Sequence, residues 1–305
     1  MKFAVSLVVA AVWAQPVMAC DLCAVYAATE AQGGSGQGLF GGVAEQFTYF
    51  NTLQVNGQDV ANDGNQYINS SVSQVFAGYN FNEHLGVQFN LPVIYRSYGY
   101  ESARGSESGI GDASFLVNAR LYEKLTEKFT FNWTALGGVK FPTGATGQLN
   151  PDQPDFSPGI AGHDLTLGSG SWDGLVGTGF FTRWKRMFLA GGMQYAIRTE
   201  GAYGYQFAND WTWFGGPGVY LLLGDENTLS LQAMVSGESK GQDTISGMAT
   251  DDTAITIVYL GPQLNYTWSS KLSAHVGVDF PVSIAASGDQ LVPNYRVRAA
   301  VTWRF

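Results

Sequence analysis

Apolar and polar residues alternate along most of the chain, in stretches separated by turn-forming sequences. A β-strand sends successive side chains to opposite faces, so a period of two predicts strands with one apolar and one polar face. The pattern predicts twelve strands, at Leu39–Leu53, Tyr67–Phe81, Leu85–Arg96, Gly109–Tyr122, Phe129–Lys140, Ser171–Arg183, Met187–Glu200, Asp210–Leu223, Thr228–Lys240, Thr253–Trp268, Leu272–Ala285 and Tyr295–Phe305.

The last eleven residues show the alternation most clearly. Three of the five polar-face positions are arginines, and the apolar face carries Tyr295, Val297, Ala299, Val301, Trp303 and Phe305. This ending resembles the C-terminal strand of bacterial outer-membrane β-barrels, in which a terminal Phe is read by the barrel-insertion machinery. The resemblance implies that Phe305 contacts that machinery.

The connections between the predicted strands alternate between short and long. The turns at 82–84, 124–128, 184–186, 224–227 and 269–270 are short, whereas the intervening loops are longer, and the loop at 142–168 is the longest. Outer-membrane barrels have this asymmetry, with short periplasmic turns and longer external loops. The polar faces are mostly Ser, Thr, Asn, Gln and Gly, unlike the charged, wet face of a soluble sandwich. We therefore predict an all-β fold: a transmembrane, up-and-down antiparallel β-barrel of about 12 strands over residues 39–305 in the bacterial outer membrane.

The predicted barrel closes when the last strand pairs with the first, Leu39–Leu53. Alternation is weakest in this first strand, because Glu45 falls on the face that is expected to contact lipid. A β-bulge or a shift of register is expected there.

The first nineteen residues have the features of a signal peptide. Lys2 is followed by an apolar run, Phe3–Ala14, which is too short to span a bilayer, and then by Val17-Met18-Ala19 at the usual cleavage spacing. The following segment, residues 20–38, holds both cysteines and a Gly-rich stretch, and it is expected to be a periplasmic linker.

Composition excludes one class of partner. The 305 residues carry a formal net charge of −9, and only 13% are charged. No basic stripe is available to neutralise phosphates, so no nucleic acid is expected as a partner.

Cys20-Asp21-Leu22-Cys23 allows three interpretations. In an oxidising compartment the two thiols form a small disulfide ring. Alternatively, they hold Cu(I) or Zn(II) together with ligands from elsewhere, or they work as a redox pair. In the third interpretation Cys20 is a lipidated N-terminus, because Val17-Met18-Ala19-Cys20 loosely resembles a lipobox.

Charged residues on the polar faces are the candidates for contact with a solute in the lumen. They are Arg96, Asp112, Arg120, Lys140, Arg198, His275, Asp279, Arg296 and Arg298. The two arginines of the last strand are structural if they pair with Asp279, and could guide a solute if they do not. His275 and Asp279 are four residues apart on one strand, or about 13 Å, which is too far for a catalytic dyad.

A family resemblance begins at Gly109-Ile110-Gly111-Asp112-Ala113-Ser114, which opens a strand that continues to Arg120-Leu121-Tyr122. This resembles the outer-membrane proteins of the phenol-degradation meta-pathway transporter family, which are similar in outline to channels of the fatty-acid transporter type. The resemblance implies passage of small apolar or aromatic molecules. The start at Cys20 departs from that family.

The expected function is an outer-membrane channel or transporter that passes a small solute by diffusion, without catalysis and without a resident cofactor. Two alternatives stay open at this stage. The barrel could anchor a metal-binding or redox-linked segment that uses Cys20 and Cys23, or it could be an outer-membrane hydrolase.

Overall fold

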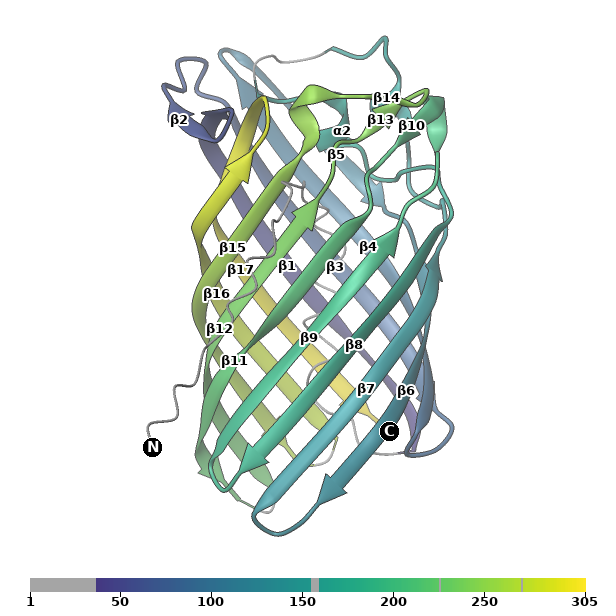
Figure 1. Cartoon of the computed structure of the whole chain (residues 1–305), viewed down its shortest axis with the longest axis vertical. Helices are drawn as coiled ribbons and strands as arrows, with labels where there is room; N and C mark the ends of the chain where they lie inside the picture. Colours follow the sequence, from purple (N-terminus) through teal and green to yellow (C-terminus); the bar gives the residue numbers. More distant parts are fainter. Residues whose placement is uncertain (1–36, 155–158, 225, 270) are drawn as a thin grey trace, which may run out of the picture.

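The alternating stretches of the chain form the wall of a closed antiparallel barrel, shown in Figure 1. The computed structural model describes residues 37–154, 159–224, 226–269 and 271–305. Its 12 wall strands are β1 (Gly38–Val55), β3 (Tyr67–Asn80), β4 (Leu85–Tyr100), β6 (Ser114–Leu125), β7 (Phe129–Lys140), β8 (Asp173–Trp184), β9 (Met187–Ile197), β11 (Asp210–Leu223), β12 (Asn227–Lys240), β15 (Ile255–Trp268), β16 (Leu272–Ala286) and β17 (Asp289–Arg304).

The first and last strands close the barrel, as predicted. β1 pairs with β17 from Phe40 opposite Arg304 to Val55 opposite Asp289. Backbone groups in lipid have no water to bind, so only closure satisfies the edges of such a sheet. No helix among the described residues has the length and apolar character needed to cross a membrane.

The irregularity expected at Glu45 lies elsewhere, so that prediction was wrong. Glu45 pairs in regular register with Ser73 of β3 and Ala299 of β17. The register of the β1–β17 pair shifts only between Tyr49 and Thr52, opposite Pro293. Proline has no N–H to give to the ladder, which accounts for the shift at that point.

The two faces of the wall differ as the alternation predicts. On β1, Gln46 faces the lumen and is 1% exposed, whereas Val43 faces outward and is 49% exposed. Aromatic side chains lie at both ends of the outward apolar band, as they do in membrane barrels. We call the end of the barrel with the long connections the extracellular end and the end with the short turns the periplasmic end, following the asymmetry of outer-membrane barrels. The extracellular girdle is Tyr67, Tyr95, Trp211 and Tyr295, and the periplasmic girdle is Tyr79, Trp184, Trp268 and Trp303.

Several strands extend further at the extracellular end than predicted. Residues 97–108 were predicted to be a loop, but β4 continues to Tyr100 and pairs with β5 (Ala103–Ile110), so β6 starts at Ser114 and not at Gly109. Similarly, β17 begins at Asp289, within the predicted loop 286–292. Hydrogen bonding between strands continues above the membrane, where side-chain polarity no longer has to alternate.

Short strands and helices also occupy this end. They are β2 (Gln58–Val60), β10 (Tyr205–Gln206), β13 (Thr244–Ile245), β14 (Met248–Ala249), α2 (Gly162–Leu165) and three 3₁₀ helices, Gly147–Leu149, Ala202–Gly204 and Asp251–Thr253.

Closure depends on close approach at Gly42 of β1. A Cβ atom there would lie 2.1 Å from the Val301 carbonyl oxygen and 2.6 Å from the Phe76 ring. We expect Gly42→Val to destabilise the barrel by about 1–3 kcal/mol through overpacking. Urea unfolding in phospholipid vesicles, followed by tryptophan fluorescence, would measure the loss.

Gly137→Val is the matched control, because a Cβ at Gly137 would have nothing closer than 4.0 Å. Equal unfolding midpoints for the two variants would contradict the packing argument.

Candidate functional site

The connection between β7 and β8 folds back into the extracellular mouth of the barrel. We call residues 141–154 and 159–172 the inner loop. Its Ile160 and Leu165 pack against a buried cluster on the wall that includes Leu53, Ile68 and Leu291. The inner loop thereby covers apolar side chains of the lumen wall, and it narrows the lumen at this end.

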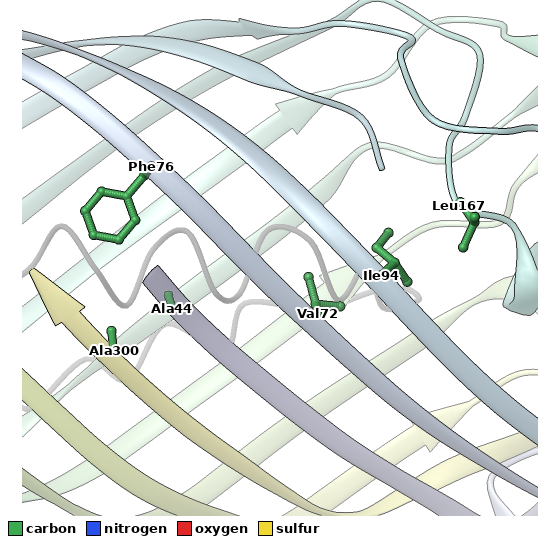
Figure 2. Close-up of a cluster of buried hydrophobic side chains, with 6 residues drawn as sticks. All are labelled: Ala44, Val72, Phe76, Ile94, Leu167 and Ala300. Carbon is green, nitrogen blue, oxygen red and sulfur yellow. The ribbon is translucent and has the colours of Figure 1, made fainter. Parts of the chain in front are cut away.

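Leu167 extends the same contact further down the wall. It belongs to a second buried cluster with Ala44, Val72, Phe76, Ile94 and Ala300, drawn in Figure 2. The cluster joins the inner loop to β1, β3, β4 and β17.

Asp112 holds the other side of the inner loop. One carboxylate oxygen, Oδ2, accepts hydrogen bonds from the Ser169 N–H at 2.9 Å, the Ser169 hydroxyl at 2.8 Å and Lys140 Nζ at 2.5 Å. The other, Oδ1, accepts the Gly144 N–H at 2.9 Å. Asp112 therefore links both ends of the inner loop to β7, and we call this set of contacts the latch.

Arg96 adds a second attachment. Its guanidinium donates to the carbonyl oxygen of Thr166 in the inner loop, and also to the Ser70 hydroxyl at 3.4 Å. Arg96 thus connects β4 and β3 to the inner loop from the opposite side of the latch.

Acidic and basic side chains alternate along the inner wall at this depth. Lys140 Nζ lies 2.9 Å from Asp173, and Arg198 lies 3.0 Å from Asp173 and 2.5 Å from Asp210. We call Asp112, Lys140, Asp173, Arg198 and Asp210 the charge belt. It runs from Asp112, between β5 and β6, to Asp210 at the start of β11, and every member is paired with a neighbour of opposite sign.

A further pair continues the pattern on β12. Lys240 lies 2.7 Å from Asp243, and the Tyr205 hydroxyl donates to Asp243 at 2.5 Å. Burial and the Asp243 carboxylate beside it raise the pKa of Tyr205 far above its usual range, so this hydroxyl stays a donor.

A separate cluster lies on β16 and β17. Asp279 accepts hydrogen bonds from Arg296 at 3.0 and 3.1 Å and from Arg298 at 2.6 and 2.9 Å. Arg296 also lies over the Tyr259 ring, 4.1 Å from its centre, and donates to Ser236 at 2.6 Å. Arg296 and Arg298 are therefore paired with Asp279. Of the two alternatives that the sequence left open, a structural role or guidance of a solute, the pairing corresponds to the structural role.

The same pairing bears on the hydrolase alternative. Asp279 is occupied by two guanidinium groups, and His275 stands opposite Asn265 and Ala300 in the strand register. The arrangement gives no support to a His275–Asp279 dyad.

The lumen is narrow near the inner loop and wider below it. Under the inner loop lies a cavity of about 100 Å³, which we call the upper chamber. Two cavities of about 150 and 580 Å³ occupy the periplasmic half and share Arg120, Asn132 and Phe181.

The walls of the upper chamber combine apolar side chains with the paired charges already described. The apolar residues include Phe50, Ile68, Leu167, Phe207, Ile255, Ile257, Leu291 and Pro293.

The structure places all nine candidates on the inner side of the barrel. Arg96, Asp112, Lys140 and Arg198 gather at the upper chamber, whereas Arg120 lies in the periplasmic half, 3.1 Å from Glu123. The remaining four, His275, Asp279, Arg296 and Arg298, are at most 7% exposed. Whether any of the nine contacts a solute stays a prediction.

Sequence reasoning missed Asp173, Asp210, Lys240 and Asp243. They stand at strand ends, where alternation gives no guidance. A signal for these residues was present in the sequence. Oppositely charged residues stand near the ends of strands that are neighbours in the barrel, so ion pairs between them could have been predicted.

Cys20 and Cys23 lie outside the described residues, so the disulfide, metal and lipidation interpretations stay predictions. Within the described part of the chain, no group of three His, Cys, Asp or Glu side chains could hold a metal ion.

Comparison with known proteins adds information on the fold. No family model matches the chain, and no curated protein matches it. The COG4313 outer membrane channel from Pseudomonas putida F1 is similar over 90% of this chain and 98% of its own, with a TM-score of 0.65 and 18% identity.

Two autotransporter domains are less similar. The NalP translocator domain from Neisseria meningitidis covers 93% of this chain and 94% of its own, with a TM-score of 0.46 and 14% identity. The β domain of Bordetella Brka covers 88% of this chain and 100% of its own, with a TM-score of 0.46 and 10% identity.

The closed barrel with its outward apolar band is an outer-membrane β-barrel, and the bacterial outer membrane is its location.

The latch predicts a specific effect on the inner loop. Asp112→Ala leaves the Ser169 and Gly144 N–H groups without their acceptor, and a buried donor left without a partner costs about 1–3 kcal/mol. Lys140 keeps its ion pair with Asp173. We expect the inner loop to become sensitive to protease while the barrel keeps its heat-modifiable mobility on gels.

Asp152→Ala, an exposed acid on the same loop, is the control. Equal cleavage rates for both variants would show that Asp112 does not hold the loop.

Proposed function

We propose that this protein is an outer-membrane channel that passes a small solute by diffusion through the barrel lumen. The observation that carries the proposal is the upper chamber. It lies between the inner loop and the wall, and its surface is largely apolar. Its Asp112, Lys140 and Arg198 lie in ion pairs, and Arg96 donates hydrogen bonds to the Thr166 carbonyl and the Ser70 hydroxyl.

These properties favour one class of solute. A charged solute that enters loses hydration and meets charges that already have partners. A small, largely apolar and neutral solute loses little hydration and gains contact with Phe50, Ile257 and Leu291.

The resemblance of Gly109–Ser114 to the phenol-degradation meta-pathway transporters supports the same class, small apolar or aromatic molecules. The fold shared with a Pseudomonas putida outer membrane channel is consistent with a channel. Asp112, the acidic residue of that motif, anchors the inner loop, which links the motif to the shape of the chamber.

The proposal needs no catalytic step. Binding is weak and reversible, and the direction of transport follows the concentration gradient. Lipid surrounds the outward band, and Phe305, whose N–H donates to the Leu39 carbonyl at 3.0 Å, is the residue we expect the insertion machinery to read.

Filling the upper chamber tests the route. We expect Ile257→Trp to reduce solute flux several-fold, because the larger ring occupies the space between the inner loop and β15. Swelling of proteoliposomes in solutions of a small neutral solute measures the flux.

Val258→Trp is the matched control, since the next residue along β15 faces outward. If the two variants pass solute equally well, the route does not run through the upper chamber.

Charge on the solute tests the selectivity. Flux of a small aromatic alcohol should exceed flux of the carboxylate of the same size, after subtraction of the flux into protein-free vesicles. The reason is that the carboxylate loses its hydration on entry, while Lys140 and Arg198 are already in ion pairs and the Arg96 guanidinium is hydrogen-bonded to the Thr166 carbonyl. Faster flux of the carboxylate, or a lumen sealed to both, would refute the proposal.

A further inference from the structure

The periplasmic half of the lumen contains a guanidinium group whose hydrogen-bond acceptors are neutral. Arg183 of β8 lines the cavity of about 580 Å³, which we call the lower chamber. Its Nη1 donates to the Lys185 carbonyl at 3.1 Å, and its Nη2 donates to the Thr130 hydroxyl at 3.3 Å. A guanidinium has more N–H donors than these two acceptors use, so Arg183 can still donate to a ligand in the chamber.

The carboxylates of the lower chamber are placed away from Arg183. Glu123 of β6 pairs with Arg120 at 3.1 Å, and Glu83 lies in the turn before β4. In the barrel order, β7 separates β6 from β8, and both β6 and β7 separate β4 from β8. Within the described part of the chain, no Asp or Glu forms an ion pair with Arg183.

Aromatic rings lie directly beside this guanidinium group. Phe188 of β9 is the cross-strand partner of Arg183, and its ring centre is 5.8 Å from that of Phe181 and 5.2 Å from that of Tyr220. Gly218, which is opposite Phe188 on β11, leaves space for the ring, because a Cβ there would lie 2.1 Å from it. All three rings line the lower chamber, and we call them the aromatic row.

We propose that the lower chamber binds a small aromatic carboxylate. The carboxylate accepts hydrogen bonds from Arg183, since guanidinium and carboxylate groups have matching geometry, and the ring of the ligand packs against the aromatic row. The volume of about 580 Å³ falls within the range of about 300–1,000 Å³ that is usual for small-molecule sites. A neutral ring gains only the row and a carboxylate without a ring gains only Arg183, so a ligand with both binds most tightly.

The two chambers therefore differ in the ligand that they favour. In the upper chamber Lys140 and Arg198 already hold the carboxylate of Asp173, so a further anion gains little there. An aromatic carboxylate consequently reaches Arg183 from the periplasmic end of the lumen. The proposal goes beyond the channel function, because this binding does not require that any solute crosses the barrel.

Direct binding of benzoate tests the site without any measurement of flux. The probe is labelled benzoate in equilibrium dialysis against the full-length protein in nanodiscs of zwitterionic phospholipid, with empty nanodiscs as the blank. We expect Arg183→Gln to weaken the binding about tenfold or more, because a charge-assisted hydrogen bond is lost. Unchanged binding in this variant, or no binding to the wild-type protein, would overturn the proposal.

Lys185→Gln is the matched control. Lys185 is an exposed cation in the next turn, its Nζ lies over the Trp184 ring at 5.1 Å, and the substitution keeps the carbonyl that accepts from Arg183. Benzoate binding should be the same as in the wild-type protein. An equal loss in Lys185→Gln and Arg183→Gln would show that the positive rim as a whole attracts the anion, which contradicts a built site.

The aromatic part of the site has its own test. Phe188→Leu should weaken the binding of benzoate several-fold and leave the binding of acetate unchanged. Acetate that binds the wild-type protein as tightly as benzoate would refute the aromatic class.

A variant of the upper chamber separates this proposal from the channel function. Ile257→Trp should bind benzoate as the wild-type protein does, whatever its effect on flux. Loss of benzoate binding in that variant would place the ligand in the upper chamber and overturn the proposal. Heat-modifiable mobility of each variant shows that the barrel has folded.

Discussion

The hydrogen-bonded closure of β1 against β17 is the constraint on which the rest of the structure depends. Within a bilayer every backbone donor and acceptor needs a partner in the protein, so the wall has to be a continuous cylinder. The pairing requires the close approach at Gly42 and tolerates one irregularity, beside Pro293. A cylinder of 12 strands is wider than one that wall side chains alone fill, which happens at about eight strands. Closure therefore creates a lumen, and the inner loop fills its extracellular end.

The inner loop is positioned by two different kinds of contact. Leu165 and Leu167 pack on the wall at β1, β3 and β4, whereas Asp112 and Arg96 bind the backbone of the loop through hydrogen bonds. Apolar packing is not directional, so it brings the loop inward without fixing its exact place. Paired charges and hydrogen bonds have defined geometry, and they determine which part of the loop faces the upper chamber.

The wall could be predicted from the sequence far better than the lumen. Alternation, together with the short and long connections, predicted the wall strands, their order and their closure. The reason is that side chains of a membrane-spanning strand face lipid at every second residue. Contacts of the inner loop could not be predicted in this way: Asp112 binds Ser169 across 57 residues, and no local pattern marks that partner. Glu45 shows a different limit. The pattern placed it on the lipid face, but the assumption that a charge is excluded there led to the wrong expectation of a bulge.

The pairing of charged side chains in the lumen affects which properties of a solute the proposed channel can select for. Unpaired cations attract anions over a distance, and salt screens that attraction. At the upper chamber, Lys140 and Arg198 share Asp173 and also pair with Asp112 and Asp210, so their field is largely cancelled at close range. Arg296 and Arg298, away from the chamber, share the single carboxylate of Asp279. In the proposed channel, what distinguishes one solute from another is then its size relative to the upper chamber and the hydration it gives up on entry. Both quantities are set by apolar residues such as Ile257 and Leu291, while the charged residues, conspicuous in the sequence, hold those surfaces in place.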